Sequence, residues 1–421
     1  MASITRLAVL LAGRHIADVE RVRSGIRLTY APDPGPMPLS LSLPSTSSQH
    51  AGAAVTTWLW NLLPDSRTAL SAIAQEYGAD PRDPLSLLEA VGMDCAGAVQ
   101  LCTPDQIEAV QQRQGSLESV SVTDLEARLA ELDMDEDASW VLPGEHWSLG
   151  GAQQKFALRR HDGQWYRALG SEPTSHIVKP GLFRVRAQAL AEYVSMKAAH
   201  RLELRAADVA YTEFGVQPAL VVTRFDRLST GDGSLARLHQ EDMSMAAGTE
   251  VKYEEDGGPS IASVVKLLRE HSSTRSQAEW NVAEFLDQVV FNVVVGSPDA
   301  HARNFSIQFT DGGLHVSPLY DVATDLGHER IGNHKRKVAM RVGGEDVRDA
   351  IGPTEWNRQA EQVGVDPDWL VGRVVWMAER LPDAIKEPFE GLDDWDGRIS
   401  ELRSRLLPNM RENCLRILSR F

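Results

Sequence analysis

A polar loop between two apolar stretches carries residues whose types and spacing could do chemistry. The sequence "VVVGSPDAHARNFSIQF" covers residues 293–309, and its β-branched run ends at Gly296. Asp299 and Asn304 follow, an acid and an amide five residues apart, before the chain becomes apolar again. A carboxylate and an amide oxygen in one loop can orient a hydroxyl group or bind a metal ion.

The residues after Asn304 predict a β-hairpin that returns a second carboxylate to the same loop. Apolar and polar residues alternate as far as Phe309, "TDGG" is a turn signal, and the return segment "LHVSPLYD" alternates as well. If Phe309 faces Leu314, Asp321 lies just beyond the paired region, beside Asn304. The sequence therefore predicts that Asp299, Asn304 and Asp321 cluster at one end of the hairpin.

Two carboxylates and an amide oxygen are hard ligands, the kind that bind Mg²⁺ together with substrate phosphates. A kinase needs such a set, because one Asp orients or deprotonates the acceptor hydroxyl while an Asn and a second Asp hold the metal ions. The alternative is that Asp299 caps a turn and Asn304 lies in a solvated hairpin end. That spacing is common by chance, and the predicted position of Asp321 is what keeps the kinase interpretation open.

The region before this loop offers groups for a nucleotide. Lys179 ends the apolar strand "SHIVKP", where a lysine could reach phosphates, and Glu192 on the next helix could pair with it. The segment "WSLGGAQQK", residues 147–155, contains Gly150 and Gly151, which would let the backbone approach a phosphate. Each feature has a plainer alternative: an exposed strand-end lysine, a solvated helix charge and an ordinary turn.

The elements that must position these groups predict an α+β protein. Short strands fill residues 1 to about 45, helices follow to residue 115, and strands with one helix return after residue 141. The later order of strand, hairpin, strand, helix and strand is typical of a small nucleotide-covering lobe. We therefore expect an amino-terminal strand-and-helix subdomain and a two-lobed kinase-like core. The predicted parts are a subdomain at 1–115, an acidic linker at 116–140, an N-lobe at 141–226 and a mostly helical C-lobe at 227–421.

Composition limits the partners and the compartment. The 421 residues carry 43 Lys and Arg against 59 Asp and Glu, a net charge of −16, so the whole surface is not expected to bind nucleic acid. Three cysteines without metal-ligand spacing are typical of a reduced cytoplasmic protein. The apolar run at residues 7–12 is too short for a signal peptide, and no run approaches the length of a membrane-spanning helix, so no membrane association is expected.

Several motifs, in order along nearly the whole chain, resemble the HipA family of bacterial serine/threonine kinases, the toxin components of toxin–antitoxin pairs. The amino-terminal motifs are "PLSLSLP", "WNLLPDS", "DPLSLLEAVGMDCAGAVQL" and "TPDQ". The later ones are "SLGGAQQKFAL", "SHIVKP", "VTRFDR", "HQEDM", "KYEEDGGPS", "NVVVGSPDAHARNFSI" and "PLYDVATD". The resemblance implies an enzyme that uses ATP and Mg²⁺.

The resemblance also implies roles for single residues. Asp299 is similar to the family's catalytic Asp, Asn304 and Asp321 to its Mg²⁺ ligands, and Lys179 to its ATP-phosphate lysine. Ser148 is similar to the serine that family members autophosphorylate to switch themselves off.

Further nucleotide contacts are implied in the same way. The loop residues expected to cover the ATP phosphates are Gly150, Gly151, Ala152, Gln153 and Lys155. Arg224 and Phe225 lie where the family's hinge meets adenine through backbone groups, although Thr223 replaces an acidic residue that is frequent there. His301 is a candidate cofactor-binding residue, but a structural role is favoured over that of a base because Asp299 already serves as one. The role of the acidic segment at residues 240–242 does not follow from the sequence.

The function implied is phosphoryl transfer from ATP to a protein hydroxyl, with a target in the translation machinery such as an aminoacyl-tRNA synthetase. The implied partner is a small helix-turn-helix antitoxin, HipB-like, which would bring the chain to operator DNA. Two alternatives stay open: a kinase of small molecules on the same fold, and a non-catalytic co-repressor that works with an antitoxin. The intact Asp299, Asn304, Asp321 and Lys179 argue against the co-repressor.

Overall fold

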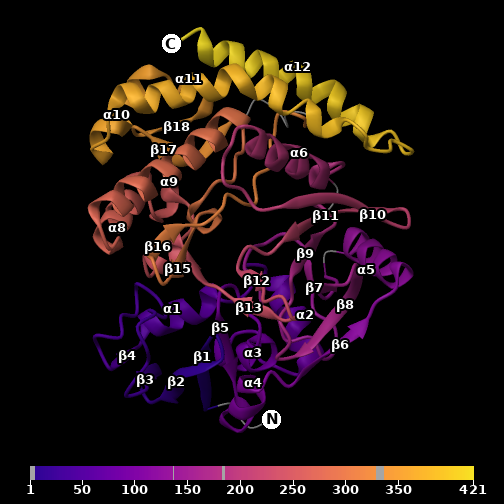
Figure 1. Cartoon of the computed structure of the whole chain (residues 1–421), viewed down its shortest axis with the longest axis vertical. Coiled ribbons are helices and arrows are strands. Elements are labelled where there is room, and N and C mark those ends of the chain that lie inside the picture. Colours follow the sequence, from indigo (N-terminus) through magenta and orange to yellow (C-terminus); the bar gives the residue numbers. More distant parts are fainter. Residues whose placement is uncertain (1–4, 136, 183–184, 329–335) are drawn as a thin grey trace. The chain divides into compact units, whose positions relative to one another are not determined.

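The structure, a computed structural model, describes residues 5–135, 137–182, 185–328 and 336–421. The chain divides into two units, each built from separate stretches of sequence. The amino-terminal unit comprises residues 1–184, 212–250 and 308–312, and the carboxy-terminal unit comprises residues 185–211, 251–307 and 313–421. Figure 1 labels most of the helices and strands of both units.

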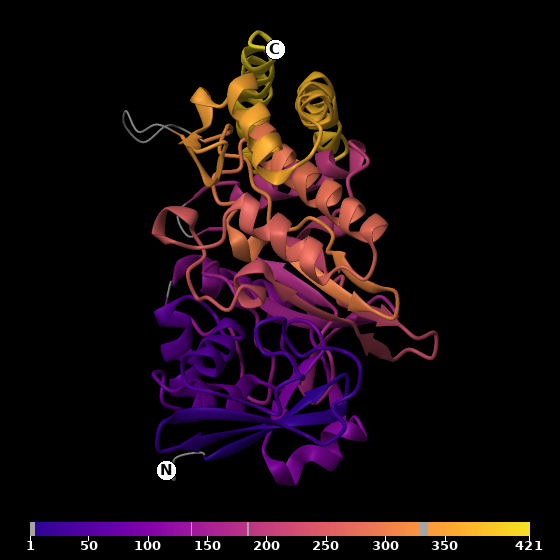
Figure 2. The same ribbon diagram turned by 90° about the vertical axis from the view of Figure 1, so that its left-hand side faces the viewer.

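The amino-terminal unit begins with a five-stranded sheet in the order β4-β3-β2-β1-β5. Its strands are β1 (Arg6–Leu11), β2 (Arg14–Val22), β3 (Gly25–Tyr30), β4 (Gln49–Ala51) and β5 (Val99–Cys102). The first three form an antiparallel meander, seen as indigo strands in Figure 2, with Leu7 opposite Val19 and Ala17 opposite Tyr30. These three strands confirm the short strands predicted at the start of the chain.

Helices follow this sheet as predicted. They are α1 (Ala53–Asn61), α2 (Arg67–Tyr77), α3 (Pro84–Val91) and α4 (Ile107–Gln111). Ser66 caps the start of α2, and Gly78 ends it in the left-handed conformation. Trp58 and Leu59 of α1 and Leu88 of α3 join the apolar core beneath the sheet.

A six-stranded sheet has the order β10-β11-β9-β7-β8-β6, and apart from residues 209–211 of β10 it belongs to the amino-terminal unit. Its strands are β6 (Gly115–Ser119), β7 (Phe156–His161), β8 (Gln164–Gly170), β9 (His176–Lys179), β10 (Val209–Phe214) and β11 (Gln217–Thr223). Shorter elements follow it: β12 (Arg227–Ser229), β13 (Leu235–Arg237), β14 (His239–Asp242) and α7 (Met243–Ala246).

Residues 116–140, predicted to be a linker, instead belong to the folded unit. They contain β6, which pairs with β8, and α5 (Val122–Met134). Leu125, Leu129 and Leu132 of α5 are buried in the same core as the sheets. The linker prediction is therefore wrong, because the leucines of α5 are buried in the core, while its acidic side chains are exposed or half-buried. Ser121 caps α5.

The carboxy-terminal unit is mostly helical, as predicted. Its helices are α6 (Gln188–Arg201), α8 (Ile261–His271), α9 (Arg275–Val295), α10 (Pro353–Val363), α11 (Pro367–Ala384) and α12 (Arg398–Leu418). Helix α11 packs against α9, α10 and α12. The remaining strands are β15 (Ser306–Thr310), of which residues 308–310 belong to the amino-terminal unit, β16 (Gly313–Val316), β17 (Lys337–Val342) and β18 (Glu345–Val347).

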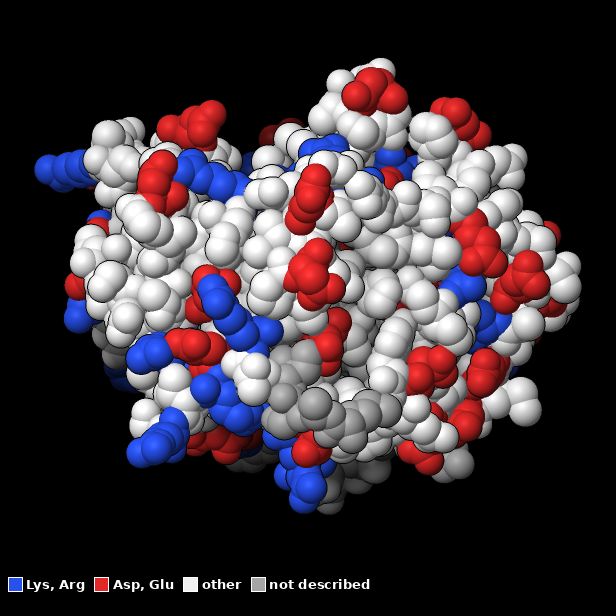
Figure 3. All heavy atoms as spheres, turned by 90° about the horizontal axis from the view of Figure 1, so that it is seen from below, with Lys and Arg blue, Asp and Glu red and all other residues white. Residues whose placement is uncertain are grey.

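Charges of both signs are spread over the face of the molecule drawn in Figure 3. Several of the surface arginines are paired with acids, for example Arg6 with Asp18 and Arg21 with Asp83. Within the described residues, no helix is both long enough and apolar enough to cross a membrane.

Candidate active site

The loop that carries Asp299 starts where the long helix α9 stops. The β-branched residues before Gly296 form the buried last turn of this helix, and Gly296 ends it with a φ of 79°. A Cβ at Gly296 would come within 2.8 Å of the Arg348 guanidinium, so only glycine fits both the conformation and the space. The left-handed conformation of Gly296 turns the chain away from the helix axis and into the loop that carries Asp299.

Backbone and side-chain hydrogen bonds join the acid and the amide of this loop. The Asn304 side-chain amide donates to the Asp299 carbonyl oxygen at 2.9 Å, and so does the His301 N–H. Asn304 is buried, whereas the Asp299 side chain is 61% exposed. Because the Asn304 nitrogen is occupied, its oxygen is the atom left for a cation, while the Asp299 carboxylate faces solvent where a substrate can reach it.

Two aromatic neighbours surround Asp299, and one of them was missed in the sequence. The Tyr253 hydroxyl donates to Asp299 Oδ1 at 2.6 Å. The rings of Tyr253 and His301 meet edge to face, 4.9 Å apart, and His301 Nε2 lies 3.9 Å from Asp299 Oδ2. His301 is buried, and its ring contacts that of Tyr253. Tyr253 belongs to the motif "KYEEDGGPS", which was the only signal for it.

The β15–β16 hairpin brings Asp321 back toward the same loop. The Ser317 N–H donates to the Ser306 carbonyl at 2.8 Å, which agrees with the predicted pairing of the two strands. The hydroxyl of Tyr320, the residue before Asp321, donates to the Arg303 carbonyl at 2.7 Å. Asp321 itself has a φ of 60°, an uncommon conformation for a non-glycine residue and one found preferentially at functional sites.

The oxygen donors on this hairpin suit magnesium. Among the described residues, no group of three or more His, Cys, Asp and Glu side chains could hold a metal ion. Magnesium does not need such a group, since one or two protein oxygens plus substrate phosphates and water suffice. The Asn304 oxygen and the Asp321 carboxylate fit that requirement.

In the amino-terminal unit, Lys179 occupies the end of β9, where it pairs with Leu220 of β11. The lysine is 5% exposed, so the alternative of an exposed strand-end lysine is wrong. Glu192 on α6 is 1% exposed, and the alternative of a solvated helix charge is wrong for it as well. Charged groups are rarely buried without a chemical or structural need.

Hydrogen bonds hold the glycine loop, residues 147–155, against the residues that follow α1. The Ser148 hydroxyl is buried and donates to the Leu62 carbonyl at 2.6 Å, and the Asp65 N–H donates to the Gly151 carbonyl at 3.1 Å. Lys155 folds back, and its ammonium group donates to the Gly150 carbonyl at 2.7 Å. Of the other predicted contact residues in this loop, Ala152 is exposed and Gln153 half-buried.

Glu145 anchors the chain just before this loop. Its carboxylate, fully buried, accepts from Arg128 of α5 and from the Trp147 indole nitrogen. Burial by itself would raise the pKa of Glu145, but the Arg128 charge and these hydrogen bonds outweigh it and hold the pKa below its ordinary value. A buried ion pair with Arg128 therefore holds the chain two residues before the glycine loop begins.

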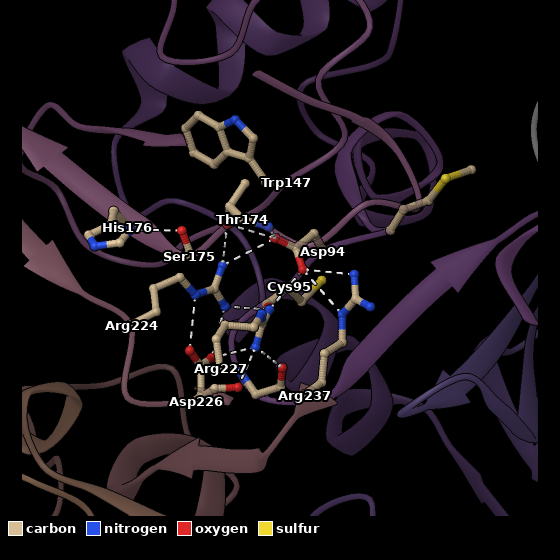
Figure 4. Close-up of polar contacts among 12 residues, drawn as sticks. Asp94, Cys95, Trp147, Thr174, Ser175, His176, Arg224, Asp226, Arg227 and Arg237 are labelled. Carbon is tan, nitrogen blue, oxygen red and sulfur yellow. Dashed lines mark hydrogen bonds and ion pairs between the residues drawn. The ribbon is translucent and has the colours of Figure 1, made fainter. Parts of the chain in front are cut away.

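The predicted hinge residues lie at the end of β11. The Arg224 N–H donates to the Ser175 carbonyl at 3.0 Å, and the Phe225 carbonyl accepts from the Gln308 side chain at 3.3 Å. These contacts occupy two of the backbone groups that the resemblance assigned to adenine. The Arg224 side chain points into a buried cluster of arginines and aspartates, shown in Figure 4, which the sequence did not predict.

The acidic motif "HQEDM" has a structural role that the sequence did not reveal. Glu241 is buried and accepts from the Ser40 hydroxyl at 2.7 Å and the Leu41 N–H at 2.9 Å. His239 contacts the Leu39 carbonyl at 2.9 Å, and Asp242 caps α7. The motif thus fastens the segment "PLSLSLP" to the rest of the amino-terminal unit.

Comparison with known proteins gives relatives for both parts of the chain. The HipA N-terminal domain matches residues 7–102, and the HipA-like C-terminal domain matches residues 147–385. A protein of Sinorhizobium fredii named "Putative kinase Y4mE" is 33% identical over 341 residues, which cover 79% of this chain and 78% of that protein. The "Serine/threonine-protein kinase toxin HipA" of Shewanella oneidensis is 27% identical over 351 residues, 79% of this chain and 77% of that protein.

The fold agrees with these sequence matches. A chain in the solved complex of Shewanella oneidensis HipA, HipB and operator DNA superposes with a TM-score of 0.82 at 23% identity, covering 98% of this chain and 97% of that one. This likeness confirms the predicted fold class. The family models of the two HipA domains match this chain in order, and the match of the C-terminal domain covers more than half of its residues. The chain therefore belongs to the HipA family.

Proposed function

We propose that this chain is a serine/threonine protein kinase that transfers the γ-phosphate of ATP to a protein hydroxyl. The observation that carries the proposal is the loop geometry around Asp299: Tyr253 orients its exposed carboxylate, and its main-chain carbonyl accepts a hydrogen bond from the Asn304 side chain. Two relatives with substantial coverage are named as kinases, which supports the same activity here.

Asp299 is the proposed catalytic residue. Its carboxylate would accept the proton of the acceptor hydroxyl as that oxygen bonds to the γ-phosphorus and the bond to ADP breaks. The Asn304 oxygen and the Asp321 carboxylate would hold magnesium, which when bound neutralises the phosphate charges. The buried His301 would support the ring of Tyr253 rather than exchange protons.

The amino-terminal unit supplies the proposed nucleotide contacts. Lys179 would pair with the ATP phosphates, and the glycine loop from Gly150 to Lys155 would turn backbone N–H groups toward them. Backbone groups near Arg224 and Phe225 would contact adenine. Phosphorylation of Ser148 would switch the enzyme off by moving the glycine loop out of this position.

The proposed target is a protein of the translation machinery such as an aminoacyl-tRNA synthetase, in the cytoplasm. The proposed partner is a HipB-like antitoxin with a helix-turn-helix, through which the chain would join a complex on operator DNA. The solved relative with this fold comes from a complex of HipA, HipB and operator DNA, which supports such a partnership.

Labelled ATP tests the proposal directly. The purified chain is incubated with γ-labelled ATP, Mg²⁺ and a cell lysate, and labelled proteins are separated and identified by mass spectrometry. We expect a labelled protein band that is absent with the Asp299→Asn variant. Label found only in small molecules would favour the small-molecule kinase, and no label in any fraction would favour the co-repressor.

A further inference from the structure

The main chain of Asp94 forms hydrogen bonds with the residues at the start of the glycine loop. Its N–H donates to the His146 carbonyl at 3.0 Å, and its carbonyl accepts from the Ser148 N–H at 3.1 Å. These two bonds form an isolated parallel bridge with Trp147, between segments more than fifty residues apart in the chain. The position of Ser148 therefore depends on the position of Asp94.

The Asp94 carboxylate is fixed in turn by the predicted hinge region. One oxygen accepts from the Thr174 N–H at 3.0 Å, the Thr174 hydroxyl at 2.8 Å and Arg224 at 3.2 Å. The other accepts from Arg227 at 2.8 Å and from Arg237 at 3.0 Å. Figure 4 shows these side chains converging on the one carboxylate. A single residue thus links the glycine loop to the end of β11.

This arginine cluster is buried and its charges do not cancel. Its members are Asp94, Arg224, Asp226, Arg227 and Arg237, all less than 9% exposed. Burial by itself would raise the pKa of Asp94, but the charges of Arg227, Arg224 and Arg237 outweigh it and hold the pKa well below its ordinary value. The carboxylate is therefore charged at neutral pH, and its removal would leave three buried guanidinium groups with Asp226 as the one acid of the cluster, which bonds Arg224 and Arg227 but not Arg237.

We infer that Asp94 is a positioning residue, which holds the glycine loop and the Arg224 segment in the register that binds ATP. The inference rests on the proposed kinase function for its effect on the reaction. Its structural part, the hold on Ser148, stands on the contacts alone. Asp94 touches neither substrate nor the reacting atoms in this proposal, and acts only through the backbone that it fixes.

The test compares Asp94→Asn with a charge-matched control, Asp226→Asn. Both residues are buried acids in the arginine cluster, so each change removes one negative charge from the same place. The carboxylate of Asp226, however, bonds Gly97, Arg224 and Arg227. The hydrogen bond from the Ser148 N–H is accepted by the main chain of Asp94 and not by Asp226.

Hydrogen exchange of the Ser148 amide and the KM for ATP are measured on the folded full-length variants. In Asp94→Asn we expect faster exchange at Ser148 and a KM for ATP raised on the order of tenfold, with a smaller change in kcat. In Asp226→Asn the Ser148 exchange should match that of the wild type. Equal exchange at Ser148 in the two variants would overturn the inference. A wild type without ATP turnover would instead refute the proposed function, while the exchange comparison would still decide the role of Asp94.

A second pair of variants, which keeps all charges of the arginine cluster, tests the inference if the Asp94 and Asp226 variants do not fold. Thr174→Ala removes one donor to Asp94, and Ser175→Ala removes a neighbouring hydroxyl that contacts Arg160 and His176 instead. We expect a smaller rise in Ser148 exchange and in the KM for ATP with Thr174→Ala only. The same values for both variants would contradict the inference.

Discussion

The Tyr253 hydroxyl donates a hydrogen bond to the Asp299 carboxylate, with 2.6 Å between the two oxygens. The residues are 46 positions apart in the chain, and the ring of Tyr253 also packs on His301. The bond directs one carboxylate oxygen and leaves the other for an incoming hydroxyl. Tyr253 is therefore a candidate orienting residue beside the candidate base.

Replacing Tyr253 by Phe removes this hydrogen bond and keeps the ring. Hydrogen bonds to charged groups contribute about 1.5–3 kcal/mol, and this one is partly exposed, so we expect kcat to fall on the order of tenfold. The KM for ATP should change little, because Tyr253 contacts the acid and not the proposed phosphate groups. Steady-state kinetics check this, and an unchanged kcat would show that the bond has no part in orienting Asp299.

Replacing Asp299 by Asn should abolish phosphoryl transfer and leave the fold intact. The amide has the same shape but cannot accept the proton of the acceptor hydroxyl, so the rate should fall by orders of magnitude. Since the side chain is 61% exposed, the thermal midpoint should stay within a few degrees of the wild type. Near-normal autophosphorylation of this variant would rule out Asp299 as the catalytic residue.

Incubation with Mg²⁺ and ATP should add one phosphate at Ser148. The unmodified hydroxyl donates to the Leu62 carbonyl, which a phosphate of about −1.5 to −2 charge cannot do. The modified glycine loop should leave its buried position, and ATP affinity should drop sharply. Mass spectrometry locates the phosphate and calorimetry measures the affinity, with the Asp299→Asn protein as an unphosphorylated control. Phosphate at other residues only, or ATP bound as tightly as before, would refute the switch.

Glu241 should make stability fall as the pH rises. Burial raises the pKa of Glu241 from 4.5 to about 8, so the folded chain keeps a proton that the unfolded chain has lost. The contribution of Glu241 to the free energy of unfolding is complete at pH values below 4.5, its ordinary pKa. It is lost by about 1.4 kcal/mol for each pH unit as the pH rises from there to its pKa in the folded chain, about 8.

Urea unfolding at several pH values across that window measures the effect. Glu241→Gln should flatten the dependence of the free energy of unfolding on pH. The matched control is Glu250→Gln, a change on the same unit outside the Glu241 contacts, which should keep the wild-type slope. Parallel slopes for wild type and Glu241→Gln would show that Glu241 is not the group responsible.

The isolated chain should bind DNA weakly. Its net charge is −16, and on the face drawn in Figure 3 acidic residues are interspersed with the basic ones. Together with a basic dimeric helix-turn-helix antitoxin, it should join a specific complex on a palindromic operator. Fluorescence anisotropy with labelled operator DNA measures both. Tight, sequence-specific binding by the chain alone would contradict the prediction.

The sequence by itself determined the local features of the candidate site. Alternation and a turn signal were enough for the hairpin that follows Asn304, because both depend on residues close together in the chain. The first three strands were predictable for the same reason. The family resemblance supplied the roles of Asp299, Asn304 and Lys179.

Only the tertiary structure decided which distant groups meet. Nothing near Tyr253 in the chain indicates that it donates to Asp299, and Asp94 contacts arginines 130 to 143 positions away. The segment at residues 116–140 is acidic enough to predict a linker, yet its leucines are buried in the core. Local patterns report a helix face or a strand face, whereas the partner of a buried charge is set by how whole elements pack, and that packing appears in no short stretch of sequence.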